Sequence, residues 1–121
     1  MDTANFLTVE SGKDLILAFA VVDPDDPTQI ESLILQRTPL YEPLLEEHER
    51  GVKVSFERFS ADEEDRLIGV HWHEDARIIR IETQLRTYNL DLRKIDSSSL
   101  KSMRRVLKQM NYDESFRLSE V

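Results

Sequence analysis

The sequence predicts an α+β fold, in which a mainly antiparallel sheet of about six to seven strands carries two helices on one face. Three observations lead to this prediction. Most segments alternate apolar and polar residues with the period of a strand, short turns separate them, and residues 42–50 and 98–110 have helix signals instead. A length of 121 residues suits one domain over residues 1–121, because two domains would each have too small a core.

The first third of the chain contains three predicted strands, at residues 5–10, 15–22 and 30–37. Ser11-Gly12 separates the first two strands as a tight turn, since glycine tolerates positive φ. Two prolines within residues 23–27 indicate a loop before the third strand.

A short helix is predicted at residues 42–50. Thr38-Pro39 has the pattern of a helix entry, and Gly51 follows the last turn as a C′ residue. Alternating apolar residues then predict a strand at 52–56. Residues 60–63 match a capping box, which predicts one helical turn or a loop there.

The clearest local pattern is a hairpin formed by residues 68–72 and 77–81. A two-residue turn at Glu74-Asp75 would place Val70 opposite Ile79 and keep the apolar side chains on one face. The opposite face would then carry the polar side chains of both strands.

The last part of the chain predicts a strand at 88–92 and a helix at 98–110. Residues 96–99 offer several N-cap side chains, and the apolar residues of the helix are spaced 3, 4 and 3 apart. Residues 112–121 fit either a final strand or a loosely packed tail.

One strand is apolar on both faces, which is unusual in this sequence. Leu15, Leu17 and Phe19 can fill the core, so the residues between them must point the opposite way. The predicted second apolar surface consists of Ile16, Ala18, Ala20 and Val22, extended by Leu33 and Leu35 of the neighbouring strand. Three explanations remain open: coverage by the chain itself, an interface with a protein partner or a second copy, and a cavity for an apolar ligand.

Charge is divided unevenly along the chain. The net charge is −8, and residues 1–85 carry 8 basic and 19 acidic side chains. The predicted last helix has one basic face, formed by Lys101, Arg104, Arg105 and Lys108. This face could bind an anion or could simply be solvated, and the acidic remainder together with the absence of interleaved aromatic residues argues against nucleic acid as a partner.

Candidate chemistry is sparse. His71 and His73 lie two residues apart on a predicted strand, so both side chains point to one face and could supply two metal ligands. A third ligand would have to come from His48, Glu57 or Glu82, and no strong metal-binding spacing is present. The chain has no cysteine and no phosphate-binding or nucleophile motif, so we expect no cofactor.

These features favour a non-enzymatic protein that binds another macromolecule or itself through the apolar sheet face. The alternatives are a nucleic-acid-associated regulator that uses the basic helix, and a metal-dependent enzyme centred on His71 and His73. The sequence shows neither a secretory signal nor an apolar run long enough to span a bilayer, so we expect a cytoplasmic protein with no membrane partner.

Overall fold

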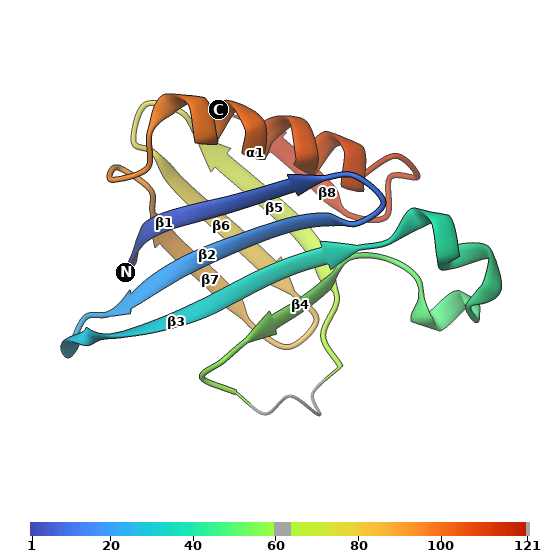
Figure 1. The fold of residues 1–121 in the computed structure, drawn as a ribbon, viewed down its shortest axis with the longest axis horizontal. Helices are drawn as coiled ribbons and strands as arrows, with labels where there is room; N and C mark the ends of the chain where they lie inside the picture. Colours follow the sequence, from blue (N-terminus) through green and yellow to red (C-terminus); the bar gives the residue numbers. More distant parts are fainter. Residues whose placement is uncertain (60–63, 121) are drawn as a thin grey trace.

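Eight strands form one sheet in the computed structural model, which describes residues 1–59 and 64–120, and one α-helix lies against that sheet (Figure 1). The predicted α+β class is therefore confirmed. The strands are β1 (Asp2–Ser11), β2 (Leu15–Asp23), β3 (Asp26–Arg37), β4 (Lys53–Phe56), β5 (Leu67–His73), β6 (Ile78–Thr83), β7 (Thr87–Asp91) and β8 (Arg117–Glu120). The helix is α1 (Ser97–Met110), and two 3₁₀ helices, η1 (Pro39–Leu44) and η2 (Glu47–Glu49), lie between β3 and β4.

The sheet is mixed, with the strand order β4-β3-β2-β1-β7-β6-β5-β8. The antiparallel pairs are β1–β2, β2–β3, β3–β4, β5–β6 and β6–β7, whereas β1 pairs in parallel with β7 and β5 pairs in parallel with β8. The predicted mainly antiparallel sheet of six to seven strands is thus in part wrong, because the sheet has eight strands and two of its pairs are parallel. The parallel pairs arise because the chain returns to the sheet after long connections, and α1 provides the crossover that brings β8 beside β5.

The sheet curls until its edge strand β4 meets the chain just before β5. Lys53 forms a β-bridge with Arg66, and the Leu67 amide donates to the Val52 carbonyl at 3.0 Å. Strands β1 to β3 consequently lie in front of β5 to β7 in Figure 1, with the core between them and α1 along the top. Trp72 and Phe19, from the two sides of this arrangement, are almost completely buried.

The predicted helix at 42–50 is wrong. The segment between β3 and β4 contains η1 and η2 instead, and it projects from the sheet as an arm in Figure 1. Pro39 and Pro43 both lie within η1, and proline lacks the N–H that an α-helix needs after its first turn. Gly51 follows the arm with a φ of 104°, a conformation that favours glycine.

The predicted hairpin forms, but with a different register. Val70 pairs with Ile81 rather than Ile79, because four residues, 74–77, connect β5 to β6 instead of two. The shift amounts to two residues, so the apolar side chains remain on the core face. The hairpin pattern predicts Ile68 on the core face. A β-bulge between Leu67 and Gly69 instead leaves the Ile68 side chain 45% exposed.

The predicted last helix is confirmed. The Asp96 side chain caps α1 by accepting the Ser99 amide proton at 3.1 Å, and the apolar stripe of the helix is buried. The tail that follows forms β8 at the edge of the sheet. The capping box predicted at 60–63 lies outside the described residues. In the described parts of the chain, no helix combines the length and apolar character that crossing a membrane requires.

Candidate functional site

The convex side of β1 to β4 carries a continuous group of side chains that we call the outer patch. It is defined by four rows of paired residues that run across the strands. The rows are Glu10-Ile16-Gln36-Lys53, Thr8-Ala18-Ile34-Ser55, Phe6-Ala20-Ser32 and Thr3-Val22-Ile30. The patch lies opposite the core, because the alternate residues of β2 and β3 are buried.

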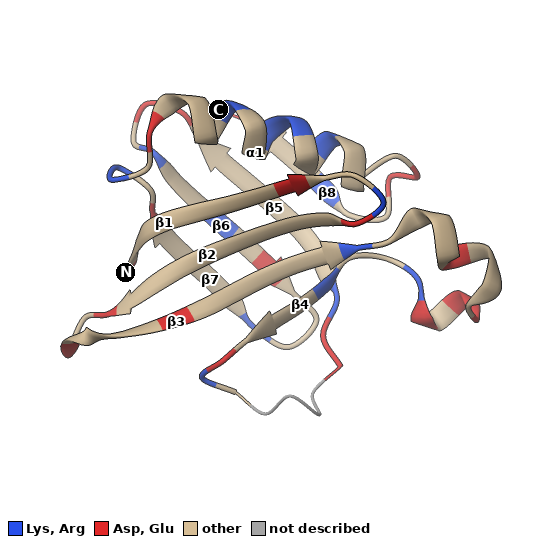
Figure 2. Cartoon of the chain, in the orientation of Figure 1, with Lys and Arg blue, Asp and Glu red and all other residues tan. Residues whose placement is uncertain are grey.

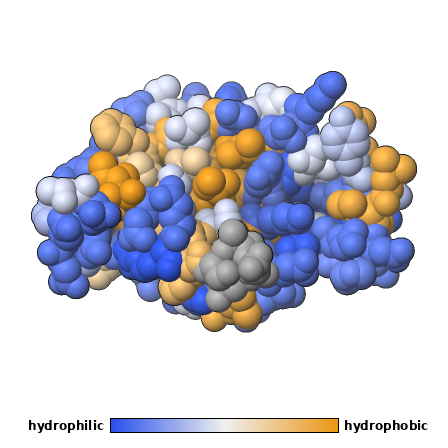
Figure 3. All heavy atoms as spheres, turned by 60° about the horizontal axis from the view of Figure 1, so that its bottom comes forward, coloured by the Kyte–Doolittle hydropathy of each residue, from blue (hydrophilic) through white to orange (hydrophobic). Residues whose placement is uncertain are grey.

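Apolar side chains make up much of the outer patch, and its two charged residues, Glu10 and Lys53, lie at the two ends of the first row. Phe6 is 68% exposed and Ile30 is 52% exposed, while Ile16, Ala18, Ala20, Val22 and Ile34 are half-buried. Figure 2 shows little charge along β1 and β2 except near their ends, while β3 also has one acidic segment within its length. Figure 3 views this part of the molecule obliquely from the β4 side, and hydrophobic side chains gather there between hydrophilic ones.

The structure corrects the predicted composition of this surface. Leu33 and Leu35 are fully buried in the core, because they pair with Phe19 and Leu17 on the inner face of the sheet. The half-buried apolar neighbour on β3 is Ile34, which pairs with Ala18. Sequence reasoning also missed Phe6, although its alternation with Leu7 and Val9 placed it on the face opposite those core-facing residues.

A pocket of about 420 Å³ lies beside β4, next to the outer patch. Its walls include the patch residues Ser32, Ile34 and Ser55 and the aromatic residues Phe56, Phe59 and Tyr88. The Phe56 ring lies 5.9 Å from the Phe59 ring and 5.6 Å from the Tyr88 ring, measured between centroids. Val54 and the charged residues Glu57, Asp65 and Arg86 complete the walls, so the pocket combines aromatic rings with charged groups. Its volume exceeds that of an aromatic side chain.

The four predicted basic residues of α1 do share one surface, which Figure 2 shows along the outer side of the helix. Arg104 is already paired: its guanidinium contacts Glu120 at 3.1 Å and Glu74 at 3.7 Å. The hydrogen bond from Arg104 lowers the pKa of the Glu120 carboxyl. Three cations, Lys101, Arg105 and Lys108, have no ion pair with any residue that the structure describes.

His71 and His73 lie on the same face of β5, as predicted, but they are not brought together with a third metal ligand. The two ring nitrogens of His71 face Ser119 Oγ at 2.5 Å and Glu82 Oε1 at 3.5 Å. The His73 side chain is exposed, and His48 lies on the arm. Within residues 1–59 and 64–120, no three His, Asp or Glu side chains form a metal-binding group.

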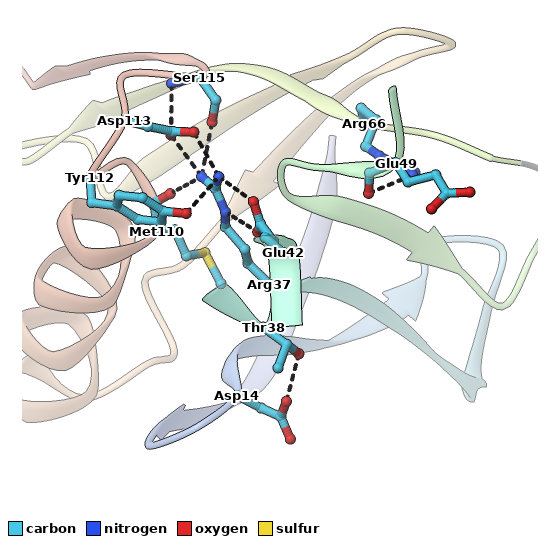
Figure 4. Close-up of polar contacts among 10 residues, drawn as sticks. All are labelled: Asp14, Arg37, Thr38, Glu42, Glu49, Arg66, Met110, Tyr112, Asp113 and Ser115. Carbon is cyan, nitrogen blue, oxygen red and sulfur yellow. Dashed lines mark hydrogen bonds and ion pairs between the residues drawn. The ribbon is translucent and has the colours of Figure 1, made fainter. Parts of the chain in front are cut away.

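A buried arginine holds the arm against the end of α1 (Figure 4). The Arg37 side chain is inaccessible to solvent, and its guanidinium contacts Glu42 Oε2 at 2.5 Å and Asp113 Oδ2 at 2.8 Å. It also donates to the Met110 carbonyl at 2.6 Å and stacks on the Tyr112 ring at 4.4 Å. These contacts join η1 to the loop after the helix, which residue spacing alone could not reveal.

The charges of this cluster stabilise one another. Burial alone would lower the pKa of Arg37, but hydrogen bonds to Glu42 and Asp113 raise it well above its ordinary value. The hydrogen bond from Arg37 in turn lowers the pKa of Asp113 to about 2. Arg37 and Asp113 are therefore both charged near neutral pH, and together with Glu42 they form a structural clamp.

No protein-family model, curated protein or solved structure matches this chain.

Proposed function

We propose that this protein binds other protein molecules through the outer patch. The observation that carries this proposal is the exposure of Phe6 and Ile30 beside five half-buried apolar residues on one sheet face. Contiguous apolar surfaces of this kind on folded proteins mark interaction sites more often than scattered single residues do. Burying a side chain such as Phe6 in an interface would contribute about 2 kcal/mol.

The geometry of the patch suits binding to a protein surface. Three of its four strands, β1, β2 and β3, pair with neighbours on both sides, so their backbone is already ordered before a partner arrives. A preordered surface loses little conformational entropy when it binds. The small side chains of Ala18 and Ala20 at the centre also permit a close approach of another backbone or sheet.

The experiment is sedimentation of fluorescently labelled protein, measured both in buffer and in extract of the native cells. A variant Ala18→Asp places a charge at the centre of the patch, whereas Asn89→Asp places the same charge on an exposed position of β7 as a control. We expect the wild type and the Asn89→Asp variant to sediment faster than a monomer in at least one condition. The Ala18→Asp variant should sediment as a monomer in both.

The proposal fails if all three proteins sediment identically in both media. Circular dichroism of the Ala18→Asp variant, compared with the wild type, establishes that a change in sedimentation reflects binding rather than unfolding.

A further inference from the structure

We infer that the protein molecule that the outer patch binds is a second copy of this chain. The twofold axis of the resulting dimer runs along the strands, between β2 and β3. This inference rests on the proposed function of the outer patch. It is carried by two complementary features on opposite sides of that axis: the exposed Phe6 ring on β1 and the aromatic pocket beside β4.

A twofold axis along the strands exchanges β1 with β4 and β2 with β3, while it preserves the position of each row along the strands. Phe6 of one copy therefore lies over the region where β4 ends in the other copy. In that region the Glu57 amide donates to the Ser32 carbonyl at 3.1 Å. Both residues also line the aromatic pocket, so the operation brings the Phe6 ring of one copy close to that pocket in the other.

The remaining rows are complementary under the same operation. In the first row Glu10 lies opposite Lys53 of the second copy, which places opposite charges together at two corners of the interface. In the second row the small side chain of Ala18 lies opposite the larger Ile34. In the fourth row Val22 of one copy lies opposite Ile30 of the other, so two apolar side chains meet.

Another twofold arrangement lacks these matches. An axis in the plane of the sheet but across the strands would place β1 over β1, so that Glu10 would face the Thr3 end of the same strand. Lys53 would then have no acidic residue opposite it within the patch, and Phe6 would not reach the pocket. Charge and shape thus favour the axis along the strands.

The size of the patch sets the expected strength of the dimer. Four strands at about 4.8 Å and four rows give a flat footprint of roughly 450 Å². A standard stable interface buries about 800 Å² on each partner, so we expect a weak, concentration-dependent dimer rather than a permanent one. The aromatic anchor then accounts for much of its affinity.

The first test is sedimentation equilibrium of the unlabelled full chain over two decades of concentration. We expect a monomer–dimer equilibrium in the wild type and a dissociation constant about tenfold or more higher in Phe6→Ala. The single variants Glu10→Lys and Lys53→Glu should each weaken the dimer. The double variant restores an attractive pair and should recover most of the wild-type affinity.

The second test uses the absence of cysteine from the chain. Thr8 and Ser55 share the second row but lie three strand spacings apart in one copy, about 14 Å. Across the proposed axis they face each other at the spacing of stacked sheets, about 10 Å, which is too far for a direct disulfide. A thiol-reactive cross-linker that spans about 10 Å should therefore link two chains in the double variant Thr8→Cys/Ser55→Cys, and neither single variant should be linked efficiently.

Several results would overturn the inference. A monomer at every concentration excludes the second copy. A dimer whose affinity is unchanged in Phe6→Ala, or one that is cross-linked equally well with Thr8→Cys alone, excludes this axis. The proposed function survives these results if Ala18→Asp still changes sedimentation in cell extract, because the outer patch then binds a different protein. The two proposals are therefore tested separately.

Discussion

Arg37 and Asp113 lie 76 positions apart in the chain, yet their side chains meet in a two-bond ion pair with distances of 2.8 and 2.9 Å. The same guanidinium also forms two hydrogen bonds with Glu42. One buried cation thus joins the end of β3, the arm and the loop after α1. The stability of this region should depend on that residue more than on any surface ion pair.

Replacing Arg37 with methionine should lower the free energy of unfolding by about 3 kcal/mol or more, because Glu42 stays buried without a partner. Chemical denaturation monitored by Trp72 fluorescence measures this change. The control is Arg58→Met, which removes an ion pair with Glu31 from a partly exposed site and should cost below about 1 kcal/mol. Equal losses in the two variants would contradict the clamp role of Arg37.

Acid should weaken the clamp in a defined pH range. The hydrogen bond from Arg37 lowers the pKa of Asp113 to about 2 from an ordinary value of 3.8. The Asp113 carboxylate therefore binds a proton less readily in the folded protein than in the unfolded chain. The stabilisation that its ion pair with Arg37 provides is complete above pH 3.8 and is lost as the pH falls toward 2. The Asp113 side chain is 42% exposed, so solvent screening keeps the contribution small.

Comparing the pH dependence of unfolding in the wild type and in Asp113→Asn measures that contribution. The variant should be less stable at neutral pH, and the difference should shrink on acidification through this range. Glu114→Gln changes the neighbouring carboxylate, which does not contact Arg37, and should keep the wild-type profile. A constant difference at every pH would contradict the expectation.

Gly51 should resist substitution, because its φ of 104° is strained for any residue with a Cβ. We expect Gly51→Ala to lower the free energy of unfolding by about 1 kcal/mol or more. Gly12→Ala is a matched control, since no atom lies within 4 Å of the Cβ that would be added there. Thermal unfolding of both variants measures the difference, and a Gly51→Ala variant as stable as the control would contradict the prediction.

The Asp96 cap should contribute measurably to α1. Asp96→Ala removes the acceptor for the Ser99 amide and should cost about 1 kcal/mol. Ser98→Ala, at an exposed position of the first turn, serves as the control and should be nearly neutral. Hydrogen exchange of the amides in the first turn of α1 provides the measurement, and equal protection in both variants would rule out the capping role.

Local patterns in the sequence predict the elements whose structure depends on neighbouring residues. The apolar stripe of α1 and the Asp96 cap lie within one helix, and the alternation in β2 lies within one strand. The register of the hairpin depends on the conformation of its turn. Arg77 in that turn has a φ of 52°, a value that is uncommon for arginine and that the sequence therefore does not predict. Pro39 and Pro43 of η1 prevent the α-helix that the other residues of this segment favour.

Contacts between distant segments could not be predicted in the same way. Alternation assigns the residues of β3 to two faces but does not say which face is buried. The prediction that Leu33 and Leu35 lie on the outer face is wrong for this reason. The pairing of β1 with β7 and the Arg37 cluster join segments more than seventy positions apart. No short-range pattern specifies such partners, because they depend on how the whole sheet curls.

The position of β1 has a consequence for biosynthesis. This strand precedes the others along the chain, yet it lies inside the sheet, between β2 and β7. Its second neighbour becomes available only after residue 91 has left the ribosome. The free edge of β1 in the emerging β1–β2–β3 meander stays unpaired until β7 has been synthesised. A chaperone that shields exposed strand edges would help most during this interval.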